Sequence, residues 1–133
     1  MAIMKWNVAI VQCKKKKMEE LNRKCEEAIL GKFSAPYNGN TYYFSCDMEA
    51  QSNFEKVDRA FEKGRITEIG WTAYDSNGDV TRLLLTSESF EPIYIRHLEH
   101  IQGNISKFRD FITPLVMSAT TLTDINDIQW NMI

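Results

Sequence analysis

Residues 69–86, IGWTAYDSNGDVTRLLLT, contain two extended stretches on either side of an Asn-Gly pair. Asn77-Gly78 is a strong signal for a type I′ hairpin turn, because both residues tolerate positive φ angles. If these two residues form the loop, Trp71 lies opposite Leu84 and diagonal to Arg82, so the indole and the guanidinium share one face. We interpret this arrangement as a packed tryptophan shielded by an arginine stem, with a ligand platform as the alternative.

A second hairpin and a helix precede this stretch. Asn38-Gly39 predicts a turn between extended segments at 33–37 and 41–45. Asp47 can then cap a helix that runs to about Lys63. One face of this helix is apolar and carries Ala50, Phe54, Val57 and Phe61. That spacing indicates a helix that packs one side against a core.

The apolar pattern in the N-terminal part of the sequence predicts a helix but does not decide where this helix starts. From Lys14 onward apolar residues recur at helical spacing, and Gly31 predicts the end of the helix. Residues 1–13 are compatible with a strand or an extension as well as with helix. Four lysines at 14–17 would oppose the helix dipole in a first turn, which favours an earlier start. We interpret this lysine run as a solvated helix face, with a local anion site as the alternative.

The longest apolar pattern lies in the C-terminal half, where Ser87 is expected to cap a helix. Its seam consists of Tyr94, Leu98, Ile101, Ile105, Phe108, Ile112 and Leu115. Because one helix cannot bury this seam alone, we expect it to pack on the N-terminal helix, on the hairpins or on a second subunit. Pro114 is expected to bend or end the helix. A short turn leading to Trp130 then starts at Thr123 or Asp124.

Together these elements predict an α+β fold in a single domain, 1–133. It comprises an N-terminal helix, two β-hairpins with an intervening helix, and a long C-terminal helix in a dimer-type seam. The length of 133 residues and the hydrophobic content of 44% are typical of one globular domain. Three cysteines without a C-x-x-C pair favour reduced thiols in a cytoplasmic protein over disulfides or a zinc site.

Charge and hydropathy exclude several classes of partner. A net charge of −2 disfavours long nucleic acids and acidic membranes, which need a broad positive field. The apolar runs are far too short for a membrane span or a secretory signal. We therefore expect no DNA partner and no membrane.

Catalysis has no support in the sequence. There is no nucleophile elbow, phosphate-binding loop or dinucleotide-binding fingerprint. His97 and His100 have no third ligand nearby to complete a metal shell, so we expect neither a metal nor a cofactor. A mixed aromatic and polar strip along the last helix is a better candidate for binding. It contains Phe90, Ile93, His97, His100, Asn104, Lys107 and Phe111. Such groups suit a nucleotide-like ligand, and they equally describe an interface rim.

Several segments resemble a phage domain of unknown function that is common near tail-fibre genes. They are Gly70-Trp71-Thr72, 75–80, the Leu-Leu-Leu-Thr that ends at Thr86, and 121–130, TLTDINDIQW. The chain as a whole resembles, more specifically, the Thoeris anti-defence proteins of the first type. This resemblance implies a phage protein that acts in the host bacterial cytoplasm as a sponge, which means that it sequesters a signal molecule. Such a protein binds the glycocyclic ADP-ribose signal of TIR-domain enzymes without cleaving it.

The resemblance also implies a homo-oligomer, either a dimer or an assembly of dimers, with ligand pockets at the subunit boundary. The ligand-binding positions expected on this basis are Trp71, Phe90, Arg96, His100 and Arg109. The aromatic pair would stack or form walls, the arginines would hold the diphosphate, and the histidine would make a polar contact. A second anion site, for cyclic oligonucleotides, is expected at Gln51 and Arg65. The alternative function is a structural or assembly accessory protein of a phage tail.

Overall fold

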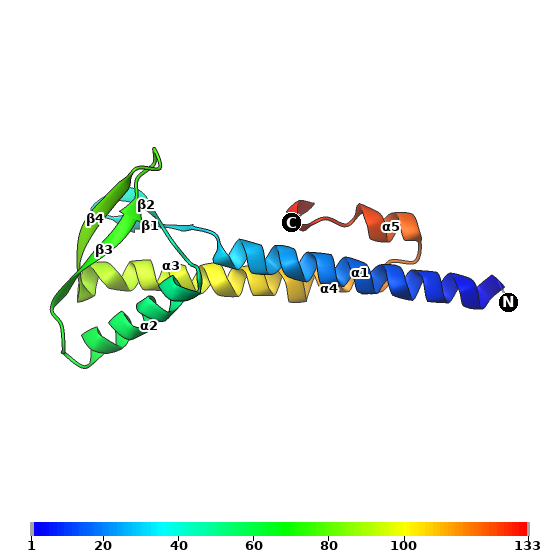
Figure 1. Cartoon of the computed structure of the whole chain (residues 1–133), viewed down its shortest axis with the longest axis horizontal. Helices are drawn as coiled ribbons and strands as arrows, with labels where there is room; N and C mark the ends of the chain where they lie inside the picture. Colours follow the sequence, from blue (N-terminus) through cyan, green and yellow to red (C-terminus); the bar gives the residue numbers. More distant parts are fainter. Residues whose placement is uncertain (1, 133) are drawn as a thin grey trace. The chain divides into compact units, whose positions relative to one another are not determined.

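The structure is a computed structural model that describes the backbone of residues 2–132 and the side chains of residues 8–132. Two compact units make up the chain, and Figure 1 labels their elements. The sheet unit comprises Ile29–Ile101, and the helical unit comprises the chain up to Ala28 and from Gln102 onward. The fold is α+β, as predicted: an N-terminal helix, two hairpins with a helix between them, and a long C-terminal helical region.

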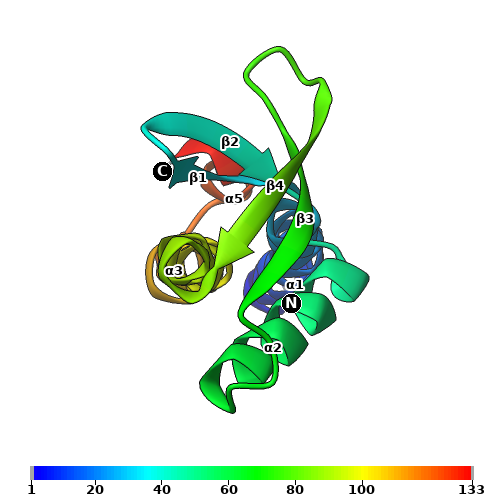
Figure 2. The same ribbon diagram turned by 90° about the vertical axis from the view of Figure 1, so that its left-hand side faces the viewer.

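The sheet unit contains a four-stranded antiparallel sheet with the strand order β1-β2-β3-β4. Its strands are β1 (Phe33–Tyr37), β2 (Asn40–Phe44), β3 (Glu68–Tyr74) and β4 (Val80–Thr86). Both predicted hairpins form, and Figure 2 shows the strong twist of the β3–β4 hairpin. In the first hairpin Asn38 and Gly39 have φ angles of 49° and 79°, as a type I′ turn requires.

The register of the second hairpin differs from the prediction by one residue. Trp71 pairs with Leu83, not with Leu84, and Arg82 pairs with Thr72. The side chain of Asp75 accepts hydrogen bonds from the backbone N–H groups of residues 77 and 79, each at 2.9 Å, and this stabilises a longer loop. Because a one-residue shift reverses the faces of a strand, Trp71 and Arg82 lie on opposite faces.

Helix α2 (Met48–Glu62) follows β2 and packs on the sheet through its predicted apolar stripe. Asp47 caps it as predicted, accepting a hydrogen bond of 2.8 Å from the N–H of Ala50. Phe54 is fully buried, and its ring centroid lies 4.6 Å from that of Trp71 and 4.3 Å from that of His97. The core of the sheet unit is therefore built around aromatic rings.

Helix α3 spans Ser87–Ser106. Its N-cap residue is Thr86 and not the predicted Ser87. The N–H of Thr86 donates to Ser89 Oγ at 2.8 Å, and the N–H of Ser89 donates to Thr86 Oγ1 at 3.4 Å. The buried face of α3 carries Phe90, Ile93 and His97. These residues belong to the strip predicted for binding, whereas Leu98 of the predicted seam is 44% exposed. Tyr94 and Ile101 of the seam are partly buried against the core, so the seam prediction is wrong at Leu98 and misses the fully buried residues.

In the helical unit the last turn of α3 is followed by a π-helical segment, Lys107–Ile112, and then by α4 (Thr113–Ser118). The N–H and the hydroxyl of Thr113 both donate to the carbonyl of Phe108, five residues earlier. This pattern accommodates Pro114, which lacks an N–H and would collide with the carbonyl four residues before it. The helix therefore does not end at the proline. Phe108 and Ile112 are buried, as the seam prediction requires, but at the end of the seam Val116 is buried and Leu115 is 41% exposed.

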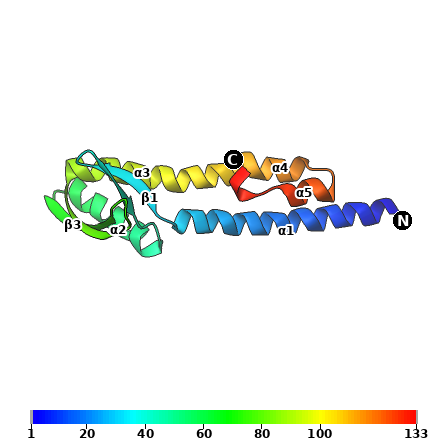
Figure 3. The same ribbon diagram turned by 90° about the horizontal axis from the view of Figure 1, so that it is seen from above.

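Helix α1 (Ala2–Leu30) begins before the lysine run, as predicted. Of the alternatives for residues 1–13, helix is correct for residues 2–13, and residue 1 lies outside the described part. Helix α5 (Leu122–Asp127) starts earlier than predicted, because Thr121 caps it by accepting a hydrogen bond from the N–H of Asp124. In the helical unit α1, α4 and α5 lie side by side (Figure 3). A 3₁₀ turn, Trp130–Met132, follows.

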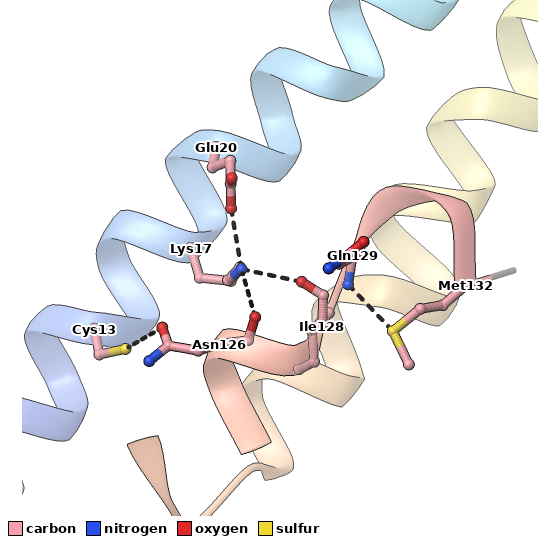
Figure 4. A network of polar contacts seen from close by, with 7 residues as sticks. All are labelled: Cys13, Lys17, Glu20, Asn126, Ile128, Gln129 and Met132. Atoms are coloured by element: carbon pink, nitrogen blue, oxygen red, sulfur yellow. Dashed lines mark hydrogen bonds and ion pairs between the residues drawn. The ribbon is translucent and has the colours of Figure 1, made fainter. Parts of the chain in front are cut away.

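Two lysines of the run have structural roles that the prediction of a solvated face did not include. Lys14 donates from Nζ to the carbonyl of Met117 at 2.7 Å. Lys17 donates to the carbonyls of Asn126 and Ile128 at 3.3 and 3.0 Å, and Figure 4 shows this network. The carbonyls of Met117 and Asn126 belong to the last turns of α4 and α5, and Ile128 is the residue that follows α5. Carbonyls at these positions lack partners within the helix, and a cation there is stabilising. The two lysines are thus C-terminal caps.

Candidate functional site

The best candidate site is a pocket of about 520 Å³ in the sheet unit, between α2 and an open edge of β3. We call it the β3-edge pocket. Its lining includes Asn53 and Lys56 of α2, Trp71 and Thr72 of β3, and Arg82 of β4. This volume lies within the range of ordinary small-molecule sites, which is about 300–1,000 Å³.

The open edge of β3 supplies backbone hydrogen-bonding groups to this pocket. Strand β2 pairs with β3 only through Tyr43 and Tyr74, at the end of β3. In an antiparallel sheet alternate residues direct their N–H and C=O groups to the same side. Gly70 and Thr72, four and two residues before Tyr74, therefore direct theirs away from β4, and both residues line the pocket.

Arg82 reaches the pocket by crossing the outer face of β3. Its Nη1 donates to Thr72 Oγ1 at 2.8 Å. The guanidinium passes over Gly70 so closely that a Cβ on this residue would lie 2.9 Å from Nη2. Only one of its five N–H groups is used by this bond. Among the described residues, no carboxylate forms an ion pair with Arg82.

Trp71 forms the inner wall of the same pocket. Its side chain is half-buried, and it packs on Phe54 and Phe90 with ring centroids 4.6 and 6.0 Å away. Trp71 and Arg82 therefore meet at one pocket although they lie on opposite faces of the hairpin. Of the predicted ligand-binding residues, Trp71 is the one placed in this pocket.

The other predicted ligand-binding residues are dispersed. Phe90 is 1% exposed and packs within the aromatic core, which leaves no ring face open to a ligand, so this prediction is corrected. Arg96 lies exposed on α3, and His100 Nε2 lies 3.0 Å from the carbonyl of Ile29. Arg109 belongs to the helical unit. None of the pockets described here is lined by two of the five predicted residues.

The predicted second anion site corresponds only in part to a pocket. A hollow of about 430 Å³ beside α2 is lined by Lys56, Arg59 and Arg65, with Glu55 as its carboxylate. Gln51 is not among its lining residues, because its side-chain amide donates to the carbonyl of Cys46 at 2.9 Å. The structure thus places Arg65 in a basic pocket without Gln51.

A buried thiol and imidazole lie close together in the core of the sheet unit. His97 Nδ1 lies 3.6 Å from Cys46 Sγ, and both side chains are almost fully buried. Burial, with a smaller contribution from Asp47, raises the pKa of Cys46 to about 11. Burial, reinforced by His100, lowers the pKa of His97. A nucleophilic cysteine needs a lowered pKa and access for substrate, so this pair is unsuited to catalysis.

The helical unit has a larger hollow, of about 630 Å³, between α1 and the C-terminal segment. Two of its lining residues, Lys17 and Trp130, are already engaged in contacts within the fold. Lys17 bonds to two carbonyls, and Lys107 Nζ lies over the ring of Trp130, 4.3 Å from its centroid. No group of three metal-ligating side chains occurs among the residues that the structure describes. None of the described helices is long and apolar enough to cross a membrane.

Comparison with known proteins identifies the family. Residues 12–130 match the domain of unknown function DUF4376. The chain belongs to the DUF4376 family. The DUF4376 match includes both hairpins, α2 and all the residues of the β3-edge pocket. No curated protein and no solved structure matches the chain.

Proposed function

We propose that the protein binds and sequesters a small cyclic nucleotide signal, the glycocyclic ADP-ribose of TIR-domain (Thoeris) immunity, without cleaving it. The observation that carries this proposal is the β3-edge pocket. There Arg82, held without a carboxylate partner, lies beside an aromatic wall and open backbone groups. A dinucleotide-like ligand needs a cation for its diphosphate, an apolar wall for its base, and polar groups for its ribose hydroxyls.

Sequestration requires no chemical step. The thiol of Cys46 and the imidazole of His97 lie close together, but this pair is buried in the core beside Phe54. Its pKa shifts favour a neutral thiol and a neutral imidazole. We therefore expect the ligand to leave the protein unchanged. In this proposal the protein acts in the host bacterial cytoplasm as a homo-oligomer.

A structural or assembly role in a phage tail is the second candidate function. It is favoured by large apolar side chains that are exposed on the helices. In the sheet unit Ile95 and Leu98 are 45% and 44% exposed, and in the helical unit Phe111 and Met117 are 55% and 62% exposed. Where such side chains form a contiguous apolar patch, they mark a surface on which another protein, or another copy of this chain, packs.

The test is to incubate the purified protein with glycocyclic ADP-ribose, wash it, denature it and identify the released molecule by mass spectrometry. Recovery of intact ligand supports sequestration, and recovery of a cleaved product indicates an enzyme. Absence of any retained ligand favours the tail role.

Two arginine variants locate the site in the same assay. We expect Arg82→Ala to abolish retention, whereas the sequence alone predicts this loss for Arg109→Ala. Loss in Arg109→Ala alone would move the site to the helical unit. Thermal unfolding of both variants checks that the fold is intact.

A further inference from the structure

We infer that Gly70, Thr72 and Arg82 form a preorganised phosphate-binding unit, and that the open backbone groups of β3 beside it bind the base of the same ligand. This inference rests on the proposed function for the identity of the ligand. The anion-binding part stands on the geometry of the hairpin. The strand register brings Gly70, Thr72 and Arg82 together, so anion binding depends on all three residues.

The register places these residues on the outer face of the hairpin. Arg82 is the cross-strand partner of Thr72, and Gly70 lies two residues before Thr72 on the same face. The hydroxyl of Thr72 accepts from Nη1 at 2.8 Å and so fixes the direction of the guanidinium. A glycine in the middle of a strand marks a close approach by another group. At Gly70 that group is Nη2, which lies where a Cβ would crowd it.

The hydrogen bond to Thr72 leaves the positive charge of Arg82 available to a ligand. A neutral hydroxyl orients the guanidinium without neutralising it, and the remaining N–H groups can form a fork onto phosphate oxygens. Lys56 of α2 lines the same pocket and supplies a second positive charge. The guanidinium of Arg82 together with the ammonium group of Lys56 suits a diphosphate better than a single phosphate, because each phosphoryl group then has its own cation.

The carboxylates of the pocket provide acceptors for the hydroxyl groups of a ligand. Asp47 and Glu49 also line it. Asp47 already accepts the N–H of Ala50, and no described residue forms an ion pair with Glu49. A carboxylate repels phosphate but accepts hydrogen bonds from hydroxyl groups. The ligand chemistry that satisfies both signs of charge is a sugar diphosphate.

The β3 edge adds a means of recognising the base. Gly70 and Thr72 each present an N–H and a C=O on the side that β2 leaves unpaired. Adenine carries an amino donor next to a ring-nitrogen acceptor on one edge, and a strand edge offers the complementary acceptor and donor. The site therefore suits a sugar diphosphate whose base presents an adjacent donor and acceptor, as the adenine of the proposed ligand does.

Gly70→Ala tests the unit with little risk to the fold. The added Cβ meets only the far end of a flexible side chain, so it displaces the guanidinium rather than the backbone. We expect the dissociation constant for glycocyclic ADP-ribose, measured by calorimetry, to rise about tenfold or more, with thermal stability unchanged or higher. Thr72→Val, which removes the acceptor but keeps the shape, should weaken binding in the same direction. Gly103→Ala is the matched control, because a Cβ there meets no atom within 4 Å.

Inorganic pyrophosphate, used as a second probe, separates the two proposals. Wild-type affinity in both Gly70→Ala and Arg82→Gln would overturn the inference while the proposed function stands. Binding of pyrophosphate that is lost in Gly70→Ala, with no binding of glycocyclic ADP-ribose, would support the anion unit and reject the proposed function. If the wild-type protein binds neither pyrophosphate nor glycocyclic ADP-ribose, both the anion-binding unit and the proposed function are wrong.

Discussion

The helical unit and the sheet unit use their positive charges in different ways. In the helical unit Lys17 donates to two carbonyls and an adjacent carboxylate, that of Glu20, and only 12% of its side chain is exposed. In the sheet unit Arg82 is exposed and held by a single neutral hydroxyl. A cation whose partners are carbonyls and carboxylates stabilises the fold, whereas one oriented by a hydroxyl keeps its charge for a ligand. This contrast is why we place the binding site in the sheet unit.

The largest predicted effect concerns the aromatic core of the sheet unit. Phe54→Ala removes a fully buried ring that contacts Phe33, Trp71, Phe90 and His97. We expect the free energy of unfolding in urea to fall by about 3–5 kcal/mol. Phe111→Ala in the helical unit is the control, because its ring is 55% exposed, and it should cost less than about 1 kcal/mol. Similar losses in the two variants would contradict the assigned core.

The second effect is a loss of stability at alkaline pH that arises in the sheet unit. The pKa of Cys46 is raised from 9.0 to about 11. Between these values the unfolded chain releases the thiol proton before the folded chain does, so stability falls as pH rises. A shift of two pKa units corresponds to about 2–3 kcal/mol across this window.

Urea unfolding between pH 8 and pH 11 measures this loss. Cys46→Ala should flatten the fall in stability relative to the wild-type protein. Cys13→Ala, a change in the helical unit, should leave it as it is. An identical pH dependence in Cys46→Ala and the wild-type protein would show that the buried thiol does not contribute.

The third effect is confined to the helical unit. Lys17→Met keeps most of the side-chain volume but removes the bonds to the carbonyls of Asn126 and Ile128. Charge-assisted hydrogen bonds of this kind contribute about 2 kcal/mol, so hydrogen exchange in residues 122–128 should accelerate. Lys15→Met, at an exposed position, is the control. Equal exchange rates in the two variants would mean that Lys17 is only a solvated charge.

Local signals in the sequence predicted much of the fold. The Asn-Gly pair at residues 38 and 39 and the N-cap Asp47 each act within a few residues, and the structure contains the first hairpin and α2 as predicted. The second hairpin forms in a register shifted by one residue, because the side chain of Asp75 competes for the loop N–H groups. The buried face of α3 was assigned only in part, because two apolar stripes run along the helix and only the tertiary structure decides how much of each is covered.

The candidate site was predictable only in part. Trp71, which was predicted to bind ligand, lines the pocket, but Arg82 lines it only because of the register that the turn prediction missed. A glycine inside a strand was the available signal, because Gly70 indicates a close approach by another group. Phe90 was mistaken for a ligand contact because spacing along a helix does not distinguish a core ring from an exposed one.

The most direct test is hydrogen exchange of the wild-type protein with and without glycocyclic ADP-ribose. We predict that ligand slows exchange in residues 68–74 and 50–57, which form the two sides of the β3-edge pocket, and leaves residues 122–132 unchanged. Slower exchange in residues 122–132, with none along β3, would contradict the placement of the site in the sheet unit.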